Sequence, residues 1–404
     1  MPSGKNEWWR DAVIYQVYPR SFSDSDADGI GDIPGILSRV DYLANLGVDA
    51  IWISPFYDSP LLDGGYDVSD FRLVDPRLGH VADVEALIHA AHAKGVKLFM
   101  DIVPNHTSSA HAWFHEVLNS EPGSPAWDRY VIKEGKGARH EFPPTNWQSV
   151  FHGDAWSPLV LANGVTTKYW YLHIFDSSQP DLNWENENVR NEVYEIMKFW
   201  LEKGVDGFRM DVISLISKQL DFPDTEYPKD YGRTIKNYYA NGPRIHEYLN
   251  ELNKKVLSKY DIMTVGEGPG INLSNGLDYV HEDRDELNMI FHFDHMFIDN
   301  GAGGKYDPID IPLPKFKKVF NDWDKKLKEK GWGSIFLGNH DFSRMVSRFG
   351  NDDIEHHSNS AKLLAMLLLT MRGTTYIYQG DEIGMTNVAY PSIDYYNDVE
   401  TLGS

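Results

Sequence analysis

Acidic, histidine and arginine side chains stand at the ends of several short apolar runs, where they could form one polar site. The residues concerned are Asp101, His106, Arg209, Asp211, Glu267, His340 and Asp341. A single acidic residue in such a place is most often a helix cap or an ordinary loop residue. Four runs that all end this way are harder to explain, because carboxylates buried near one another destabilise a fold unless they serve a function. The pattern therefore predicts a functional site.

Carboxyl groups in this arrangement are typical of glycoside hydrolysis, which uses two of them on either side of the scissile bond. Asp211 suits the nucleophile, because the guanidinium of Arg209 favours its charged form and lowers its pKa. Glu267 follows an apolar strand, where partial desolvation would raise its pKa towards the value that a general acid needs. Asp341 would bind sugar hydroxyls and stabilise positive charge on the ring. A retaining enzyme needs the first two carboxyl groups about 5–5.5 Å apart.

The same histidines and carboxylates could instead form a metal site. Neither His106 nor His340 has a second histidine four residues away, the helical spacing that many zinc sites use. The chain has no cysteine, which excludes disulfides, thiolate chemistry and cysteine-based metal sites. It also shows no glycine-rich loop of the kind that holds phosphate groups. These observations favour the hydrolase over the metal site.

Eight β-rich runs alternate with helical segments, which indicates an α/β fold with a parallel sheet covered by helices. Eight strands fit a closed (β/α)8 TIM barrel, whose strand ends meet at the catalytic face. Val84–Lys94, which stops before Gly95, and Glu187–Leu201 show clear helical patterns. The expected strands are Ala12–Tyr18, Val48–Ser54, Lys97–Val103, Val205–Asp211, Ile262–Glu267, Leu287–Phe293, Ser334–His340 and Thr374–Gln379.

The segment from Pro104 to about Thr167 interrupts this alternation. It is rich in Pro, Gly, His and Trp and is too long for an ordinary loop. Its many aromatic residues favour a small inserted subdomain over a disordered insertion. We therefore expect the first part of the barrel, with strands 1–3, at residues 1–103. The inserted subdomain would follow at 104–167, and the second part of the barrel, with strands 4–8, at 168–404.

The charge of the chain limits the classes of partner. Its 404 residues carry 38 Lys plus Arg against 60 Asp plus Glu, a net charge of −22. This acidity disfavours nucleic acid and anionic membranes, which would repel the surface. No signal peptide is visible, and the longest apolar run, Leu363–Met371, is too short to span a bilayer. The sequence predicts a cytoplasmic protein without an organic cofactor and does not predict its oligomeric state.

Four motifs resemble those of the α-amylase superfamily, glycoside hydrolase family 13, and within it the oligo-1,6-glucosidase and α-glucosidase branch. They are DIVPNHTS at Asp101–Ser108, GFRMDVI at Gly207–Ile213, TVGE at Thr264–Glu267 and LGNHD at Leu337–Asp341. The resemblance runs from Trp8 to the end of the chain. It implies a TIM barrel with Asp211 as nucleophile, Glu267 as acid/base and Asp341 as transition-state stabiliser. It implies substrate contacts from His106, Arg209, His340, Asp63, Tyr66, Phe151, Phe175 and Gln179.

The resemblance also bears on the products and on the linkage that is cut. A pocket closed at the non-reducing end by Asp63 and Tyr66 would release single glucose units rather than cut internally. Val212 follows the nucleophile, where relatives that cut α-1,6 links tend to have Val and maltases Thr. A methyl group in place of a hydroxyl changes shape and polarity beside the leaving group. The expected activity is therefore a retaining, exo-acting α-glucosidase of short α-glucosides that prefers α-1,6 links.

Three other functions remain open. A trehalose-6-phosphate hydrolase would share the motifs and need a cationic patch for the phosphate, for which Lys218 and Arg233 are candidates. A sucrose isomerase would use the same glucosyl-enzyme and differ in excluding water. A non-catalytic carbohydrate-binding or transporter-associated relative would have lost the carboxylates and would carry a membrane helix. Because all three carboxylates are present and no such helix is visible, this last reading is disfavoured.

The segment Asp24–Asp32 alternates Asp with other residues and resembles the first half of a calcium loop. No Glu stands at the twelfth position, so an EF-hand is not indicated, and a solvated acidic turn is the alternative. The resembling family holds a structural Ca²⁺ in this loop. Its ligands would be Asp24, Asp26, Asp28, the carbonyl of Ile30 and Asp32, and the ion would take no part in catalysis.

The chain ends at Ser404, soon after the eighth expected strand, whereas members of this family are usually much longer. We therefore expect the eighth helix and the C-terminal β-domain of the family to be absent. A downstream Arg that relatives place near the first glucose subsite is absent as well. Without the helix, an apolar flank of strands eight and one would be exposed to water.

Overall fold

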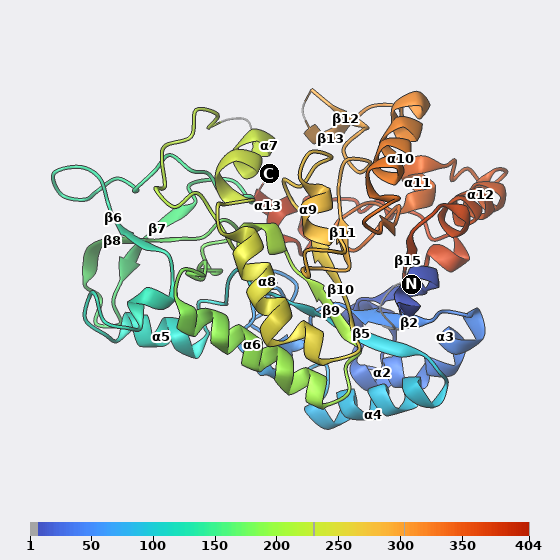
Figure 1. The fold of residues 1–404 in the computed structure, drawn as a ribbon, viewed down its shortest axis with the longest axis horizontal. Coiled ribbons are helices and arrows are strands. Elements are labelled where there is room, and N and C mark those ends of the chain that lie inside the picture. Colours follow the sequence, from blue (N-terminus) through green and yellow to red (C-terminus); the bar gives the residue numbers. More distant parts are fainter. Residues whose placement is uncertain (1–6, 229–230, 303, 404) are drawn as a thin grey trace.

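A rolled sheet of eight parallel strands forms the centre of the molecule in the computed structural model, which describes residues 7–228, 231–302 and 304–403 (Figure 1). The strands lie in the order β11-β10-β9-β5-β2-β1-β15-β14. This order confirms the predicted α/β barrel. The strands are β1 (Val13–Val17), β2 (Ala50–Ile53), β5 (Lys97–Ile102), β9 (Gly207–Met210), β10 (Met263–Glu267), β11 (Met289–Phe291), β14 (Ser334–Ile335) and β15 (Thr374–Tyr378).

Each of the eight predicted runs contains one of these strands, although the strands are shorter. The largest difference is at β14, which covers only the first two residues of the predicted run Ser334–His340. In the described residues, no strand pairing links β11 to β14, the two ends of the sheet order. A side-chain contact joins them instead, because the hydroxyl of Ser334 donates to the carbonyl of Ile290 at 2.7 Å.

Helices cover the outside of the barrel (Figure 1). The two predicted helices are present as α4 (Val81–Ala93) and α6 (Glu187–Glu202). Gly95 follows α4 with a φ of +75°, a left-handed conformation that suits glycine and ends a helix. The other helices are α1 (Pro19–Phe22), α2 (Ile33–Ser38), α3 (Val40–Leu46), α5 (Ala112–Leu118), α7 (Tyr231–Thr234), α8 (Ile245–Lys255), α9 (Gly276–Val280), α10 (Leu313–Leu327), α11 (Met345–Phe349), α12 (His357–Thr370) and α13 (Val399–Gly403).

The strands separate two hydrophobic cores because successive side chains point to opposite faces. Within β2, Trp52 belongs to the cluster that fills the barrel, whereas Ile51 and Ile53 belong to the cluster under the helices. Ile14 of β1, Phe99 of β5 and Val265 of β10 also belong to the inner cluster. The barrel interior is therefore a packed core of large side chains. The residues that follow these core residues, at the carboxyl ends of the strands, form a surface over the end of the barrel.

The segment after β5 folds into a small unit at one side of the barrel (Figure 1). It contains α5 and a three-stranded antiparallel sheet of β6 (Ile132–Glu134), β7 (Trp156–Val160) and β8 (Thr166–Leu172). Strand β8 runs across residue 167, where the sequence places the end of the subdomain. The domain boundaries themselves stay a prediction. Two small hairpins lie elsewhere, β3 (Tyr57–Asp58) with β4 (Asp70–Val74) and β12 (Asn300–Gly301) with β13 (Gly304–Pro308).

The flank of strands eight and one, expected to be exposed, is largely covered. A short 3-10 helix at Asp381–Ile383 follows β15, and its Glu382 carboxylate accepts hydrogen bonds from the hydroxyls of Tyr15 and Tyr42. In the part of the chain that the structure describes, only short helices follow β15. Exposed apolar side chains lie on α3, at Tyr42 and Leu46, and on α12 and beyond it, at Leu363, Met366, Leu369, Ile383, Val388, Ile393 and Tyr395.

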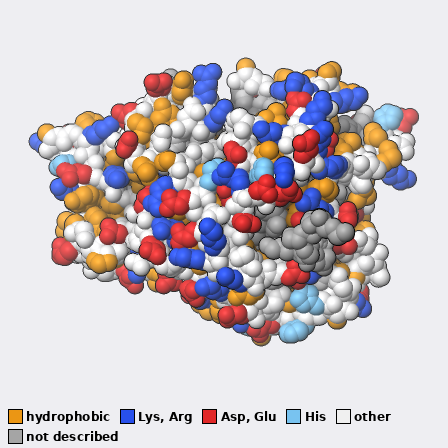
Figure 2. Space-filling view, in the orientation of Figure 1, with side chains coloured by type: hydrophobic (Ala, Val, Ile, Leu, Met, Phe, Trp, Pro, Cys, Tyr) orange, Lys and Arg blue, Asp and Glu red, His pale blue; other side chains and the backbone are white. Residues whose placement is uncertain are grey.

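Acidic and basic side chains are interspersed over the face seen in Figure 2, without one large basic region. No helix in the described residues is long and apolar enough to cross a bilayer.

Candidate active site

The polar cluster predicted from the sequence lies one step beyond the packed barrel interior. In β5, Phe99 fills the barrel and Asp101, two residues later, points to the same side. In β10, Val265 and Glu267 are related in the same way. Arg209 of β9 lies opposite Asp101 on one neighbour and opposite Val265 on the other. The alternation that fills the core therefore brings three charged side chains together at the ends of three adjacent strands.

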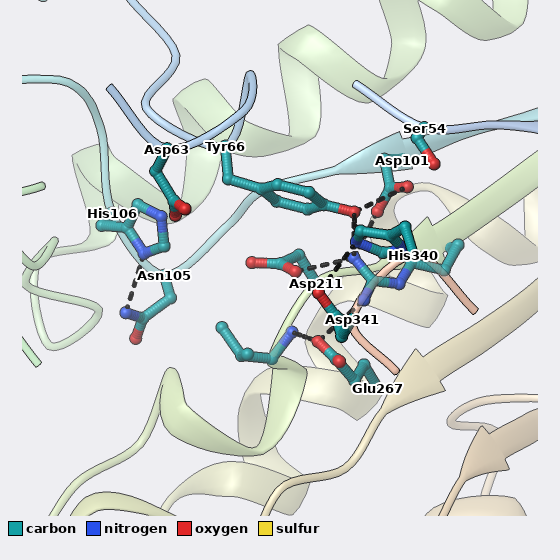
Figure 3. A network of polar contacts seen from close by, with 12 residues as sticks. Ser54, Asp63, Tyr66, Asp101, Asn105, His106, Asp211, Glu267, His340 and Asp341 are labelled. Atoms are coloured by element: carbon teal, nitrogen blue, oxygen red, sulfur yellow. Dashed lines mark hydrogen bonds and ion pairs between the residues drawn. The ribbon is translucent and has the colours of Figure 1, made fainter. Parts of the chain in front are cut away.

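Arg209 is the centre of this cluster and is only 1% exposed. Its Nη1 donates to Asp101 Oδ1 at 2.5 Å and to Asp211 Oδ1 at 2.6 Å. Its Nη2 lies 2.9 Å from Glu267 Oε2. Because Asp211 and Glu267 bind the two terminal nitrogens of one guanidinium, their carboxyl groups border the same small space (Figure 3). The spacing of about 5–5.5 Å expected for a retaining enzyme stays a prediction.

The cluster carries more negative than positive charge. Burial raises the pKa of Asp101 to about 6. Burial also raises the pKa of Asp211 well above its ordinary value, and the charges of Glu267 and Asp101 add to this effect. The expectation of a lowered pKa for Asp211 is therefore wrong, because one guanidinium cannot offset the loss of water and two neighbouring carboxylates. The carboxyl group of Asp211 is therefore harder to ionise at this site than it would be in water.

Tyr66, His340 and Asp341 form one wall of the space above the cluster (Figure 3). The rings of Tyr66 and His340 stack with centroids 5.3 Å apart, and the tyrosine hydroxyl lies 2.7 Å from Nε2 of the histidine. Burial lowers the pKa of His340 to about 3, which keeps its ring neutral. Asp341 lies 3.3 Å from the same Nε2, and its side chain is 48% exposed. This wall therefore offers an aromatic platform, a neutral imidazole and an accessible carboxylate.

Asp63, His106 and Gln179 form a second wall. Nε2 of Gln179 donates to Asp63 Oδ2 at 2.8 Å and lies 3.2 Å from Nε2 of His106. Burial raises the pKa of Asp63 to about 7 and lowers that of His106 to about 4. The ring of Phe175 packs 5.2 Å from His106, and the ring of Phe151 packs 5.6 Å from Phe175. The structure thus places these five predicted contact residues in one connected group.

Val212, the expected determinant of linkage, has an unusual backbone. Its φ of +35° and ψ of +40° are left-handed, a conformation that is rare for a β-branched residue and costs on the order of 1–3 kcal/mol. The same turn directs its backbone N–H to Glu267 Oε2 at 2.9 Å. The strained residue therefore connects the candidate nucleophile Asp211 to the candidate acid/base.

Several buried polar residues of the site are not found by sequence reasoning, and Lys218 is found only as a candidate for binding a phosphate. Gln16 Nε2 lies 2.9 Å from Nδ1 of His340, and Trp52 Nε1 donates to Asp101 Oδ2 at 2.8 Å. Asn105, Asp181 and Lys218 surround His106 on the side away from Gln179. The sequence carries one signal for some of them, because Gln16 and Lys218 each interrupt an apolar stretch.

The acidic loop after α1 brings part of the predicted calcium site together. Carboxylate oxygens of Asp24, Asp26 and Asp28 lie within 4.8 Å of one another. Both oxygens of Asp24 accept backbone N–H groups, which lower its pKa. Asp32 is used differently, since it caps α2 through the N–H of Gly35 and also binds Ser25. Three clustered carboxylates suit a hard cation, whereas Asp32 is not part of this group of carboxylates.

For Ile30, the remaining expected ligand, the structure shows a contact of the backbone amide. The backbone N–H of Ile30 donates to Asp28 Oδ1 at 2.7 Å. The role of the Ile30 carbonyl stays a prediction.

Known proteins are similar to this chain in sequence and in fold. Residues 16–402 match the family model of the alpha-amylase catalytic domain. The chain is 53% identical over 397 residues to an oligo-1,6-glucosidase from Parageobacillus thermoglucosidasius, covering 98% of this chain and 69% of that relative.

Solved structures are also similar to this chain in sequence and in fold. A trehalose-6-phosphate hydrolase from Bacillus licheniformis is 45% identical, with a TM-score of 0.90. An isomaltulose synthase from Protaminobacter rubrum is 42% identical, with a TM-score of 0.92. Each match covers 98% of this chain and 69% of the other.

Proposed function

This chain belongs to the alpha-amylase family and is a glycoside hydrolase, and on that premise we propose that it is a retaining, exo-acting α-glucosidase of short α-linked glucosides. We propose further that it prefers α-1,6 links. The observation that carries the proposal is the shared guanidinium of Arg209, which holds Asp211 and Glu267 on its two terminal nitrogens. Two carboxyl groups on one small space are what double displacement at a sugar carbon requires.

The reaction proceeds in two displacements. A carboxylate oxygen of Asp211 attacks the anomeric carbon while the Glu267 carboxyl group gives its proton to the leaving glycosidic oxygen. In the second step Glu267 takes a proton from water, whose oxygen attacks the anomeric carbon and releases Asp211. The sugar ring carries positive charge in both transition states, and the excess of carboxylates around Arg209 stabilises that charge.

The two walls of the site support binding of one terminal glucose. Asp63, His106 and Gln179 present one acceptor and two polar ring or amide groups to sugar hydroxyls. The buried ring of Tyr66 gives an apolar surface against which a sugar ring packs. In Figure 3, Asp211 lies between Asp63 and His106 on one side and His340 on the other, which supports a pocket bounded by both walls and release of single glucose units.

The linkage preference depends on Val212. Its side chain is 8% exposed and its backbone N–H binds Glu267, so it lies beside the position of the leaving group. The isopropyl group presents no hydroxyl there, which supports an α-1,6 over an α-1,4 preference.

Trehalose 6-phosphate is the second candidate substrate, because a solved relative is a hydrolase of that compound. Its phosphate would need a cation in the pocket. The Lys218 ammonium is bound to Asn105, Asp181 and the carbonyl of Leu215, and its side chain is 5% exposed. Arg233 lies over the ring of Tyr227 at 5.2 Å. Because the Lys218 ammonium is already bonded to three protein groups, an uncharged glucoside is favoured over trehalose 6-phosphate as the substrate.

We also propose that Asp24, Asp26 and Asp28 hold a structural Ca²⁺, with oxygen ligands that such an ion prefers. The ion would neutralise three exposed carboxylates and stabilise the loop, and it would supply no step of the reaction. A cytoplasmic location remains a prediction from the sequence.

Product analysis by NMR tests the proposed function directly. The purified protein is incubated with isomaltose, maltose, sucrose and trehalose 6-phosphate, and the first anomer released is recorded before mutarotation. We expect isomaltose to be cleaved fastest. The reducing-end glucose of isomaltose and maltose is itself largely the β anomer, so the anomer is read on sucrose and trehalose 6-phosphate, whose only free glucose comes from the glucosyl-enzyme. We expect α-glucose first from these two, and initial release of β-glucose from either would contradict retention. Faster cleavage of trehalose 6-phosphate, or conversion of sucrose into an isomeric disaccharide, would favour one of the other two activities.

A further inference from the structure

Lys218 is a buried lysine next to the candidate active site. It has no role in the proposed reaction. Its ammonium donates to Asn105 Oδ1 at 2.9 Å and to the carbonyl of Leu215 at 2.7 Å, and it pairs with Asp181 Oδ2 at 2.8 Å. An ammonium has three N–H donors, and these three partners engage all of them. Its side chain is 5% exposed. A charged group buried at such cost and fully bonded is expected to hold its neighbours in a defined arrangement.

The first consequence is that the Asn105 amide has one orientation. Its oxygen faces the Lys218 ammonium, and its nitrogen lies 3.2 Å from Asp181 Oδ2. A rotated amide would place two N–H groups against the ammonium and an oxygen against the carboxylate. Both contacts would be repulsive, so the nitrogen of Asn105 is fixed on the side of Asp181.

The second consequence concerns the ring of His106. The fixed amide nitrogen of Asn105 lies 3.2 Å from Nδ1 of that ring (Figure 3). Because the amide nitrogen can only donate, Nδ1 has to accept. Burial keeps the ring neutral, with a pKa of about 4. A neutral imidazole carries one N–H, which must therefore be on Nε2.

The third consequence is an arrangement of donors. Gln179 is also fixed, because its Oε1 accepts from the N–H of Asp176 at 3.1 Å and its Nε2 donates to Asp63 at 2.8 Å. Nε2 of Gln179 and Nε2 of His106, 3.2 Å apart, are then both donors. Two buried donors that face each other are satisfied when a ligand oxygen accepts from both.

We propose that Lys218 is a positioning residue, which acts through Asn105 to hold His106 as the Nε2-protonated tautomer, so that His106 and Gln179 donate together to one sugar hydroxyl oxygen. The identity of the ligand as a sugar rests on the proposed function. The tautomer does not, because it follows from the protein contacts alone.

Nitrogen-15 NMR of labelled histidine reads the tautomer without any substrate. The spectrum of a His106→Gln variant identifies the His106 signals among the 16 histidines of the chain. In the unmodified protein we expect Nε2 in the range of a protonated ring nitrogen and Nδ1 in the range of an unprotonated one. The opposite assignment in the unmodified protein would overturn the proposal.

Two variants test the path from Lys218 to His106. Lys218→Met removes the ammonium and keeps the aliphatic chain, so the Asn105 amide can rotate and the Nδ1-protonated tautomer should appear. Asn105→Asp places an acceptor beside Nδ1 and leaves Lys218 a partner, so it should shift the proton to Nδ1. If Lys218→Met fails to fold, Asn105→Asp decides. Retention of the Nε2 proton in every variant that folds would overturn the proposal.

Kinetics on a chromogenic α-glucoside give an independent measurement. We expect kcat/KM to fall roughly 10- to 100-fold in both variants, with most of the change in KM, because the lost contact is made in the ground state as well. Lys97→Met is the matched control, since Lys97 pairs with Asp206 at 3.2 Å at the start of β5. It should leave the His106 signals and the kinetic constants unchanged. If the tautomers behave as expected and no α-glucoside is cleaved, the proposed function fails and the positioning role stands.

Discussion

The chemistry of the cluster around Arg209 follows from an imbalance of charge between neighbouring side chains. Three carboxyl groups, from Asp101, Asp211 and Glu267, contact one guanidinium. The arrangement stabilises a cationic sugar ring between the carboxyl groups better than it stabilises the neutral substrate, and this difference accelerates a reaction. Arg209 in turn lowers the electrostatic cost of holding the three groups together.

Asp211→Asn tests the role of the nucleophile. The amide keeps the size of the side chain and can still contact Arg209, but it cannot form the covalent intermediate. We expect kcat to fall by about four or more orders of magnitude, measured on a chromogenic α-glucoside. Asp352→Asn, at an exposed position, serves as the control and should keep full activity. Turnover of the Asp211 variant within tenfold of the unmodified protein would rule out the assignment.

Asp63 should make the stability of the protein depend on pH. Its pKa is raised from the ordinary value of 3.8 to about 7, chiefly by burial. The folded state therefore binds a proton that the unfolded state releases, so this stabilisation is complete below about pH 4 and is lost as the pH rises through 7. Asp63→Asn removes the titration. Relative to the unmodified protein, the variant should gain up to about 4 kcal/mol of unfolding free energy between pH 4 and pH 9.

Urea unfolding at several pH values measures this difference. The prediction concerns the change in the difference with pH, because other groups affect both proteins equally. Parallel stability curves for the two proteins would contradict the raised pKa of Asp63.

At the residue scale, the sequence predicts the charged members of the site better than their supports. Asp101, Arg209 and Glu267 are recognisable because they end apolar strands. Asn105 and Asp181 have no such signal, since a buried amide or carboxylate looks like a loop residue until its partner is known. Asp181 meets Asn105 across 76 positions of the chain, and no local pattern encodes such a contact.

At the element scale, the predicted strands are present because each is a short apolar run with a clear end. β14 is the exception, and only Ser334 and Ile335 of its run form ladder bonds. Phe336 and Leu337 are buried although they lie beyond the strand. An apolar run thus predicts burial more securely than it predicts backbone pairing.

Gly207, the first residue of β9, is required by the close approach of β10. Its φ is +154°, and a Cβ atom there would lie 2.0 Å from the carbonyl oxygen of Met263. We expect Gly207→Ala to separate these two strands and to cost at least about 3 kcal/mol, measured by urea unfolding. Gly95→Ala is the control, because its φ of +75° is left-handed but open space surrounds it. It should cost only about 1–2 kcal/mol. Equal effects of the two substitutions would contradict the steric argument.

In the acidic loop before α2, substitutions can separate the stability that comes from the helix cap from the stability that comes from the proposed ion site. Asp32→Ala removes the cap of α2 and should lower the melting temperature with or without a chelator, by an amount worth about 1–2 kcal/mol. Asp26→Ala leaves the cap intact. It should lower the melting temperature only when Ca²⁺ is present, because the unmodified protein alone then gains the stability of the bound ion. An unmodified protein whose melting temperature ignores both Ca²⁺ and chelator would argue against the ion.

At the scale of the whole molecule, the outer face of α12 carries apolar side chains that contact water. Leu363, Met366 and Leu369 are 59%, 57% and 53% exposed and lie three residues apart on one side of the helix. Replacement of all three by Gln should reduce self-association in light scattering and leave the unfolding free energy within about 1 kcal/mol. Leu364→Gln is the contrast, because Leu364 is 5% exposed and its replacement should cost about 3 kcal/mol. A large loss of stability in the triple variant would show that this face is packed.

The break in strand pairing between β11 and β14 gives the molecule a weak line along its length. Six strands have a backbone ladder on both edges, but these two have one on a single edge, and the Ser334 hydroxyl bridges the gap. Thermal fluctuations that open the barrel should therefore begin at this junction. The amide proton of Ile335 should exchange with solvent faster than that of Phe99, which lies in β5 on the opposite side of the barrel. The barrel should open most easily where strand pairing is missing, and this junction between β11 and β14 lies beside the loop that carries Asp341.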